Sequence, residues 1–489
     1  MLKENDLLLD RTSRFKEKFI EDLRHGKFAR GDLIPPRHLL AETYNISTST
    51  VTRVVRDLTR NRILVTRKGR FGGTYLLNKP KQPGEIKKIR FHFSSSPEKK
   101  VRAGLFRRWL DQFMRENPDY QAEIIPQVFH FQQMETMSPE FVSLHEHELP
   151  SIMLIPLSSL PGLAARKLIR PLIADPAEAF RETQIFLPEI RSALLVNGEM
   201  YGYLTEGISL STIIYSRERL KRCKVSEQEL SGNWGNWLKA LRKLSIDGGG
   251  LLLEHDGLGV FLIFSHLLKE FLGENWILTM SDWNGIMSSR ECIAALEELQ
   301  NLEKSVGLIV DEQSNQWQTL SRLAANGPAA LMTVSSGAKN YFSFVRNPDE
   351  LIMAPFPSMT ANVPNLLGNT MVWVLTHEAD REVALTFLRW AVSPEPWLEH
   401  WQTGNNPGNE FLIPPLQANK NLMEQASAAS AWEKFQKQIS GTPIALEPPS
   451  PVDFRLSVGK LLLNWLKSGG TVHDGQERLC GLWASWIDR

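Results

Sequence analysis

The sequence predicts a small α+β helix-turn-helix module followed by a larger α/β body. Amphipathic helices and two short strands within residues 14–77 predict the module, and strands alternating with helices after residue 85 predict the body. Charge separates the same two parts. Residues 1–81 carry 18 Lys and Arg against 9 Asp and Glu, a net charge of +9, and the remaining residues carry −8. Only the first segment therefore has the electrostatic footprint of a nucleic-acid-binding protein.

The first helix of the helix-turn-helix is expected to begin after Pro35 or Pro36, with a turn at Asn45. The side chains expected to face inward are Leu39, Leu40 and Tyr44. A helix earlier in the chain is amphipathic as well, and its apolar residues are Phe15, Phe19, Ile20 and Leu23. Together these helices predict a compact three-helix core once a second helix follows the turn.

That second helix has one apolar face and one polar face. Ser47 or Thr48 can cap it, and its apolar residues recur at i, i+3, i+4 and i+7: Val51, Val54, Val55 and Leu58. The opposite face carries Ser49, Thr52, Arg53, Arg56 and Arg60. Hydroxyl and guanidinium groups bind phosphate oxygens and base edges, so this face is predicted to enter a DNA major groove. A solvated surface helix is the alternative interpretation of the same pattern.

Two strands after this helix predict a wing. Residues 63–65 and 74–77 have strand composition, and the basic, glycine-rich residues 67–73 join them. Glycine lets the wing backbone approach the sugar-phosphate chain, and the cations can enter a minor groove. The flanking elements therefore favour a winged helix-turn-helix over an ordinary surface helix.

At this point the chain resembles the GntR family of bacterial transcription regulators. The resemblance rests on Gly26, Gly31-Asp32, Pro35, Leu40-Ala41-Glu42, Ser47, Thr50-Val51, Leu58, Gly69-Arg70, Gly72 and Thr74. The chain departs from the family where arginines usually touch DNA, because His38, Thr48 and Thr52 stand there instead. The candidate DNA-binding residues are Arg37, His38, Ser47, Thr48, Ser49, Thr50, Thr52, Arg53, Arg56, Lys68, Arg70 and Gly72. The resemblance implies a homodimer that reads two half-sites of double-stranded operator DNA about one helical turn apart.

A short connector separates the module from the body. Asn78 to Glu85 contains two prolines, a glycine and no apolar side chain. We expect a DNA-binding domain over residues 1–78, a linker over residues 79–85 and a second domain over residues 86–489. In the body, strands are expected at 86–93, 123–128 and 151–157, with a helix at 101–116. This alternation predicts an α/β domain with a mainly parallel sheet.

The body resembles the type II extracellular solute-binding proteins, especially the carbohydrate-binding kind of ABC importers. The fragments that carry the resemblance, in order, are residues 113–118, 168–172, 197–204, 213–220, 233–238, 326–332, 353–357 and 384–390. This resemblance implies a two-lobed, periplasmic-binding-protein-like fold that closes around a small solute. In such proteins a signal peptide or a lipid anchor precedes the first strand, whereas here a DNA-binding module does. A transport receptor reused as a ligand sensor is the implied function.

The candidate ligand-binding residues come from segments near the cleft of that fold. Sugars stack on aromatic rings and present hydroxyl groups to polar side chains, and this chain has 14 tryptophans. The candidates are Trp373, Tyr201, Glu206, Trp283, Ser94, Ser335 and Ser336. Core packing is the competing interpretation for the tryptophans. It is preferred for Trp109, Trp237, Trp390, Trp397 and Trp465, which lie at helical spacings.

Other classes of function are not favoured by the sequence. No catalytic residues, metal site or cofactor are expected, and His145-Glu146-His147-Glu148 lacks the helical spacing of a zinc site. The start of the chain has no apolar signal segment, no run reaches membrane-spanning length, and the three cysteines are far apart. A cytoplasmic protein with no membrane contact is therefore expected.

Two alternatives remain for the body. One is an aminotransferase-like domain, for which Ser335 to Lys339 would imitate a pyridoxal-phosphate lysine segment. The other is a sensor of a peptide, an opine or another solute that is not a sugar.

Overall fold

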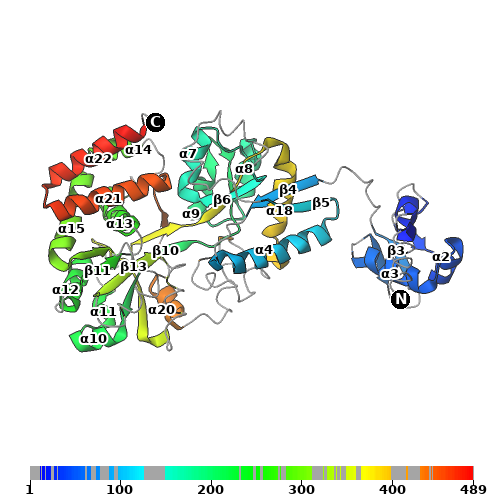
Figure 1. Ribbon diagram of the computed structural model, residues 1–489, viewed down its shortest axis with the longest axis horizontal. Coiled ribbons are helices and arrows are strands. Elements are labelled where there is room, and N and C mark those ends of the chain that lie inside the picture. Colours follow the sequence, from blue (N-terminus) through cyan, green and yellow to red (C-terminus); the bar gives the residue numbers. More distant parts are fainter. Residues whose placement is uncertain are drawn as a thin grey trace. The chain divides into compact units, whose positions relative to one another are not determined.

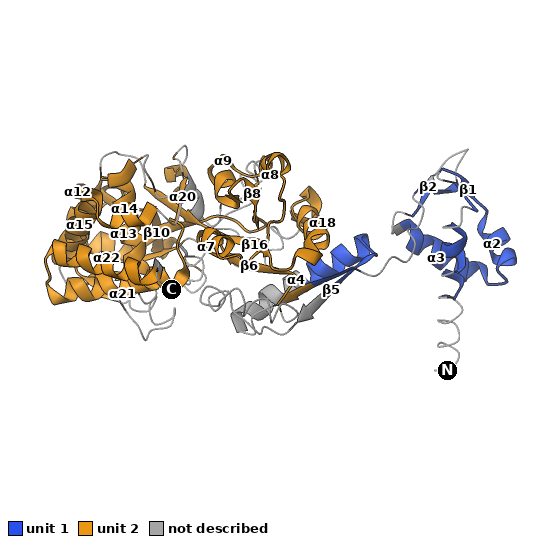
Figure 2. Ribbon diagram, turned by 90° about the horizontal axis from the view of Figure 1, so that it is seen from above, with its two compact units in different colours: residues 1–89, 106–123 blue, residues 90–105, 124–489 orange. Residues whose placement is uncertain are grey.

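The computed structural model describes residues 12, 14–16, 18–23, 27–29, 31–60, 63–67, 73–77, 87–92, 97–125, 149–230, 233–245, 249–253, 257–273, 276, 282–310, 323, 328–334, 338, 342, 348–359, 365–397, 413, 415–416, 430–439, 442 and 444–487. The chain divides into two compact units (Figure 2). Unit 1 comprises residues 1–89 and 106–123, and unit 2 comprises residues 90–105 and 124–489.

Unit 1 contains the winged helix-turn-helix. After helical residues within 12–23, its elements are β1 (Leu33–Ile34), α2 (Arg37–Thr43), α3 (Thr48–Arg60), β2 (Leu64–Arg67) and β3 (Gly73–Leu76). The strands form an antiparallel sheet in the order β1-β3-β2. One apolar cluster joins the helices to the sheet: Phe15, Phe19, Leu23, Ile34, Leu40, Ala41, Val51, Val54, Val55, Leu58, Leu64 and Leu76. The predicted winged helix-turn-helix is confirmed.

The turn and the caps of this module follow from its sequence, with one exception. Asn45 has a φ of 50°, a left-handed conformation that asparagine tolerates, and it reverses the chain between α2 and α3. The prediction that Leu39 faces inward is wrong, because its side chain is 43% exposed. Helix α2 begins at Arg37, and the helical twist turns Leu40 and Ala41 toward the core and Leu39 toward solvent.

The segment that follows the wing begins the α/β body. Its elements are β4 (Lys87–His92), α4 (Pro97–Glu116) and β5 (Tyr120–Ile125), and β4 pairs with β5. Helix α4 begins earlier than expected, because proline at the first position of a helix is compatible with its geometry. Strand β5 also begins before the predicted residue 123. The expected linker over residues 79–85 lies outside the described residues.

The first lobe of unit 2 is built on a small antiparallel sheet of order β6-β16-β9, of which Figure 1 labels β6. Its elements are β6 (Ile152–Pro156), α7 (Leu160–Ala165), α8 (Pro176–Thr183), α9 (Pro188–Arg191), β7 (Leu195–Val196), β8 (Glu199–Met200), β9 (Gly202–Tyr203), β16 (Met371–Leu375) and α18 (Arg381–Ala391). Two short turns of 3-10 helix, at Leu157–Ser159 and Ser192–Leu194, complete it.

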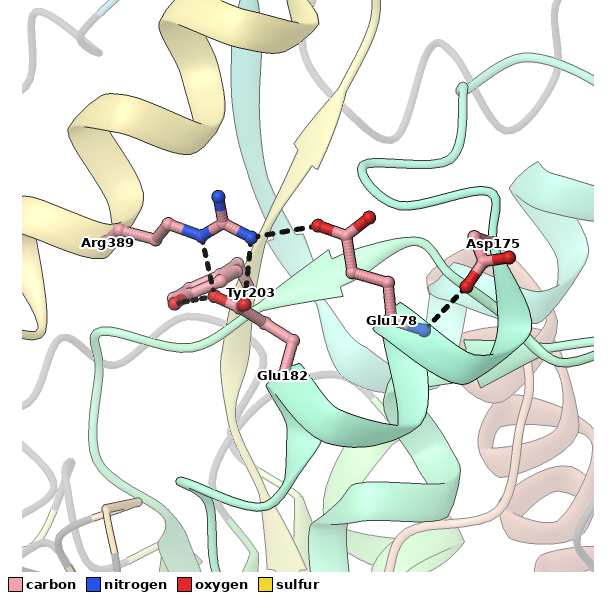
Figure 3. A network of polar contacts seen from close by, with 5 residues as sticks. All are labelled: Asp175, Glu178, Glu182, Tyr203 and Arg389. Atoms are coloured by element: carbon pink, nitrogen blue, oxygen red, sulfur yellow. Dashed lines mark hydrogen bonds and ion pairs between the residues drawn. The ribbon is translucent and has the colours of Figure 1, made fainter.

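A polar network ties α8 and α18 to this sheet (Figure 3). Arg389 donates from Nε and Nη2 to the two carboxylate oxygens of Glu182, each at 2.9 Å. The buried Tyr203 donates its hydroxyl hydrogen to Glu182 at 2.8 Å. Burial alone would raise the pKa of Glu182, but these bonds hold that pKa below its ordinary value. The ionised Glu182 therefore joins a strand and two helices of the first lobe.

The second lobe is built on a larger mixed sheet. Its described strands lie in the order β12-β11-β13-β10-β15-β17, with β14 pairing against β10. The strands are β10 (Ser209–Ser216), β11 (Leu251–Leu253), β12 (Leu308–Val310), β13 (Ala330–Val334), β14 (Leu351–Pro355), β15 (Leu366–Asn369) and β17 (Ile444–Leu446). The helices are α10 (Arg217–Cys223), α11 (Glu227–Leu230), α12 (Trp234–Leu244), α13 (Leu258–Leu272), α14 (Asp282–Met287), α15 (Arg290–Val306), α20 (Ser430–Ile439), α21 (Val452–Ser468) and α22 (Val472–Ile487). Helices α13, α15, α21 and α22 pack against one another (Figure 1).

The prediction of a mainly parallel sheet is wrong, because the described strands pair in both directions. Strand β10 pairs antiparallel with β13, β14 and β15, and β6 pairs antiparallel with β16. Parallel pairing is found for β11 with β12 and β13, and for β15 with β17. The chain runs from the first lobe into the second through β10 and returns through β15 and β16. The returning strand β15 therefore pairs antiparallel with β10, and β16 pairs antiparallel with β6.

Among the described residues, no helix combines the length and the apolar composition that a membrane span requires.

Candidate DNA-binding face and candidate solute cavity

Helix α3 presents the polar face that the sequence predicts. Its inward valines and Leu58 are buried, whereas Ser49, Arg53 and Arg56 are exposed and Thr52 is half-buried. Arg37 and His38, at the start of α2, are exposed as well. The exposed arginines of α3 lie one helical turn apart, at i and i+3, so both can reach one DNA strand. The arrangement places two exposed cationic side chains beside a row of hydroxyl groups.

The hydroxyl groups at the start of α3 hold one another. The Ser47 Oγ accepts a hydrogen bond of 3.2 Å from the Thr50 backbone N–H, which caps the helix. It also lies 2.8 Å from the hydroxyl oxygens of Ser49 and Thr50. The Thr52 hydroxyl donates to the carbonyl oxygen of Thr48 at 2.8 Å. Lys68, Arg70 and Gly72 of the predicted wing lie outside the described residues.

A cavity lies between the two lobes of unit 2. First-lobe residues line one side: Leu157, Ser158, Pro161, Ser192, Ala193 and Leu195. Residues at the ends of β15 and β17 line the other side: Gly368, Asn369, Leu446, Glu447 and Pro449. The cavity volume is about 60 Å³, below the ~300 Å³ at which pockets for whole small ligands begin. In this conformation it fits the edge of a solute rather than all of it.

Backbone hydrogen bonds between and within the lobes surround this cavity. The Ser450 N–H donates to the Ser158 carbonyl at 2.9 Å, and the Leu157 N–H donates to the Thr370 carbonyl at 2.8 Å. The Glu447 N–H donates to the Gly368 carbonyl at 2.8 Å. Segments far apart in sequence, after β6, between β15 and β16, and after β17, therefore meet at one place.

The charged side chain of the cavity is paired. Arg455 Nη1 donates to Glu447 Oε2 at 2.7 Å, and both side chains are only 4% exposed. Burial raises the pKa of the Glu447 carboxyl, and the Arg455 guanidinium opposes that rise. The pair adds no net charge to the cavity.

None of the described candidate ligand residues from the sequence analysis lines this cavity. Trp283 is fully buried among Phe261, Phe454 and Trp483. Trp373 is 6% exposed, donates its indole N–H to Thr205 at 2.9 Å and meets Phe91 edge to face. Both rings are buried in the cores of their lobes, and their contact with a solute stays a prediction.

The remaining candidates stay predictions. Tyr201 is half-buried and donates its hydroxyl hydrogen to Glu199 at 3.1 Å, and Glu206 is half-buried. Ser94, Ser335 and Ser336 lie outside the described residues. So do Lys339 of the alternative pyridoxal-phosphate segment and the acidic, histidine-rich residues 145–148.

The polar residues of the cavity were missed by sequence reasoning. Ser158, Asn369 and Glu447 were not among the candidates. Asn369 stands in the segment expected at the edge of the cleft, four residues before the tryptophan that was chosen. Polar side chains of the cleft segments are the signal that could have identified these residues, because sugar hydroxyl groups bind hydroxyl, amide and carboxylate groups.

Comparison with known proteins finds matches for both parts of the chain. Residues 11–75 match the model of the "Bacterial regulatory proteins, gntR family". A curated relative, the "Putative HTH-type transcriptional regulator RmpR" of Mycobacterium gastri, is 26% identical over 90 residues. The aligned region covers 18% of this chain and 33% of that protein, so the match spans about a third of the relative's length.

Solved structures match the rest of the chain. A cyclo/maltodextrin-binding protein complexed with maltotetraose has a TM-score of 0.60 at 15% identity, covering 83% of this chain and 99% of its own. The sugar-binding protein MalE from Xanthomonas citri has a TM-score of 0.62 at 14% identity, covering 82% and 98%. An ABC transporter solute-binding protein from Agrobacterium vitis with bound D-mannitol has a TM-score of 0.56 at 14% identity, covering 82% and 98%. At these identities the likeness shows the fold.

The chain is thus a DNA-binding module joined to a two-lobed binding-protein fold. Its amino-terminal part is a GntR-type winged helix-turn-helix, and its carboxyl-terminal part has the periplasmic-binding-protein-like architecture of the sugar-binding solute receptors.

Proposed function

We propose that this protein is a ligand-responsive transcriptional regulator of the cytoplasm. One observation carries the proposal: a GntR-type module with an exposed hydroxyl and guanidinium face and a solute-receptor fold occur in the same chain. The proposed domains are residues 1–78 for DNA binding, residues 79–85 as a linker and residues 86–489 for the solute. Two copies form a homodimer that binds double-stranded operator DNA.

The effector in this proposal is a small carbohydrate. Support comes from the fold, whose solved relatives include proteins complexed with maltotetraose and with D-mannitol. The cavity between the lobes lies where movement of one lobe against the other changes its size. Solute binding therefore favours one lobe arrangement, and its effect on DNA binding can be no larger than the free energy by which the solute prefers that arrangement.

The test uses the full-length chain. Operator duplexes are first selected from a random DNA library, and their affinity is then measured with and without maltotetraose or D-mannitol. The same solutes are tested by thermal shift, where a ligand at 100 times its dissociation constant stabilises the fold by about 2.7 kcal/mol. We expect sequence-specific binding that a sugar changes at least fivefold. Stabilisation by pyridoxal phosphate, with its absorbance band, would instead support the aminotransferase-like alternative.

A further inference from the structure

The Ser158 hydroxyl at the wall of the cavity is a buried polar group without a hydrogen bond. Its side chain is 5% exposed, and its Oγ has no hydrogen-bond partner among the described residues. Buried hydroxyl groups in folded proteins nearly always have a partner, because an unpaired one costs about 1–3 kcal/mol. Since Ser158 lines the cavity, a group inside the cavity can supply that partner.

Asn369 and Glu447 face the same cavity with capacity left over. The Asn369 Oδ1 accepts from the Thr370 N–H at 2.8 Å, and the amide keeps its two N–H donors. Arg455 binds Oε2 of Glu447, and a carboxylate can accept about four hydrogen bonds in all. The cavity therefore combines a hydroxyl, an amide donor and an ionised acceptor within one small volume.

The Arg455 guanidinium sets the state of that acceptor. Arg455 lies near the start of α21 and is not among the residues that line the cavity. A carboxylate as buried as Glu447 would take up a proton without a cation beside it. The guanidinium opposes the rise that burial causes in the pKa of Glu447 and directs its carboxyl group. Glu447 is thereby a strong acceptor for a ligand O–H, while the pair adds no net charge that would attract an anion.

We propose that Ser158, Asn369 and Glu447 form a subsite for adjacent hydroxyl groups of an uncharged polyol or sugar, with Arg455 as its positioning residue. The subsite excludes phosphorylated sugars, because a phosphate would meet the Glu447 carboxylate. This inference rests on the proposed solute-binding function, and it adds the residues that would bind the solute and the restriction to uncharged solutes.

The test measures dissociation constants of the full-length protein by calorimetry for maltotetraose, D-mannitol, D-glucose and D-glucose 6-phosphate. For the uncharged probe that binds best, Glu447→Gln should weaken binding at least tenfold, as expected for the loss of a charged acceptor. Ser158→Ala should weaken it about threefold to tenfold. Thermal unfolding of each variant shows whether it is folded, and Ser158→Ala removes no ion pair.

Two matched controls separate the subsite from general effects of burial. Ser159→Ala removes a buried hydroxyl, also without a hydrogen-bond partner among the described residues, that does not line the cavity. Glu182→Gln alters an Arg-paired carboxylate of the first lobe. Both should leave the dissociation constant within twofold of the wild-type value.

The positioning role of Arg455 has its own readout. Wild-type affinity should fall on acidification only when Glu447 is protonated, and in Arg455→Gln that fall should occur at a higher pH. Arg455→Lys keeps the cation and should return the profile toward the wild type. Equal profiles for all three proteins would overturn the positioning role.

The remaining outcomes separate the two proposals. Binding of D-glucose 6-phosphate in preference to D-glucose, or unchanged affinity in both Ser158→Ala and Glu447→Gln, would overturn this inference and leave the sensor function standing. Binding of none of the four probes would overturn the carbohydrate function, and this inference with it.

Discussion

The indole Nε1 of Trp283 donates a hydrogen bond of 2.8 Å to the carbonyl oxygen of Pro449. Trp276 does the same for the carbonyl oxygen of Leu446, at 2.9 Å. Both carbonyls belong to residues that line the cavity between the lobes. Two tryptophans of the second lobe therefore bind the backbone of residues that line the cavity, although neither tryptophan lines it.

Trp283→Phe should destabilise the second lobe by about 2 kcal/mol, because the Pro449 carbonyl would lose its partner in a buried place. The measurement is urea unfolding followed by circular dichroism. Trp276→Phe is the matched control, and since Trp276 is only partly buried, water can replace its N–H and the loss should be smaller. Identical urea midpoints for Trp283→Phe and the wild type would show that the indole N–H does not hold the wall.

Similar bonds give other tryptophans of the body a structural role. Trp283, Trp276 and Trp465 each donate to a backbone carbonyl. Trp237 donates to Tyr215 and Trp373 to Thr205. A buried indole needs both an apolar environment and an acceptor, and here the protein itself supplies both. These five tryptophans therefore have a structural role in the lobes.

The spacing of apolar residues in the sequence predicted those features of the fold that depend on residues close together in the chain. The spacing of Val51, Val54, Val55 and Leu58 predicted the buried face of α3 and, by exclusion, its exposed polar face. The cavity depends instead on contacts such as Ser450 with Ser158, which are 292 residues apart. No repeat in one sequence encodes such a pairing. Family-like fragments located the fold, but its strand directions and polar subsite required the structure.

Arg53→Ala and Arg56→Ala should each weaken operator binding at least tenfold while leaving sugar affinity unchanged. Both guanidinium groups are exposed on the face of α3. If each binds a phosphate, its removal should also lower the salt dependence of binding by about one unit of slope. The measurement is fluorescence anisotropy with operator DNA over a range of salt. Arg222→Ala, on an exposed position of α10, is the control, and an equal loss there would indicate a nonspecific effect of charge.

Ser47 should separate helix capping from DNA binding. Ser47→Ala removes the acceptor for the Thr50 N–H and should destabilise the module by about 1 kcal/mol. Ser47→Asp keeps a good cap, so thermal stability should return, but its negative charge faces the phosphates and operator affinity should stay low. Recovery of both properties in Ser47→Asp would place this residue away from the DNA.

Acid stability should depend on His266, which is fully buried on α13 and stacks on Phe356 with ring centroids 4.1 Å apart. Burial, and then the charge of Lys269, hold the pKa of His266 well below its ordinary value of 6.5. The folded protein therefore binds fewer protons than the unfolded chain below pH 6.5. Stability from this residue is present above pH 6.5 and is lost as the pH falls toward the folded pKa, by about 1.4 kcal/mol per pH unit.

His266→Phe should flatten this dependence, because phenylalanine keeps an aromatic ring beside Phe356 and binds no proton. The measurement compares the free energy of unfolding of wild type and variant in urea at several pH values from 7.5 to 5. Groups that titrate in both proteins cancel in the difference, which leaves the contribution of His266. The difference should change by about 1.4 kcal/mol per pH unit below pH 6.5. A difference that does not vary with pH would mean that the imidazole takes up its proton equally well in the folded protein, and burial would then not be the cause of acid sensitivity.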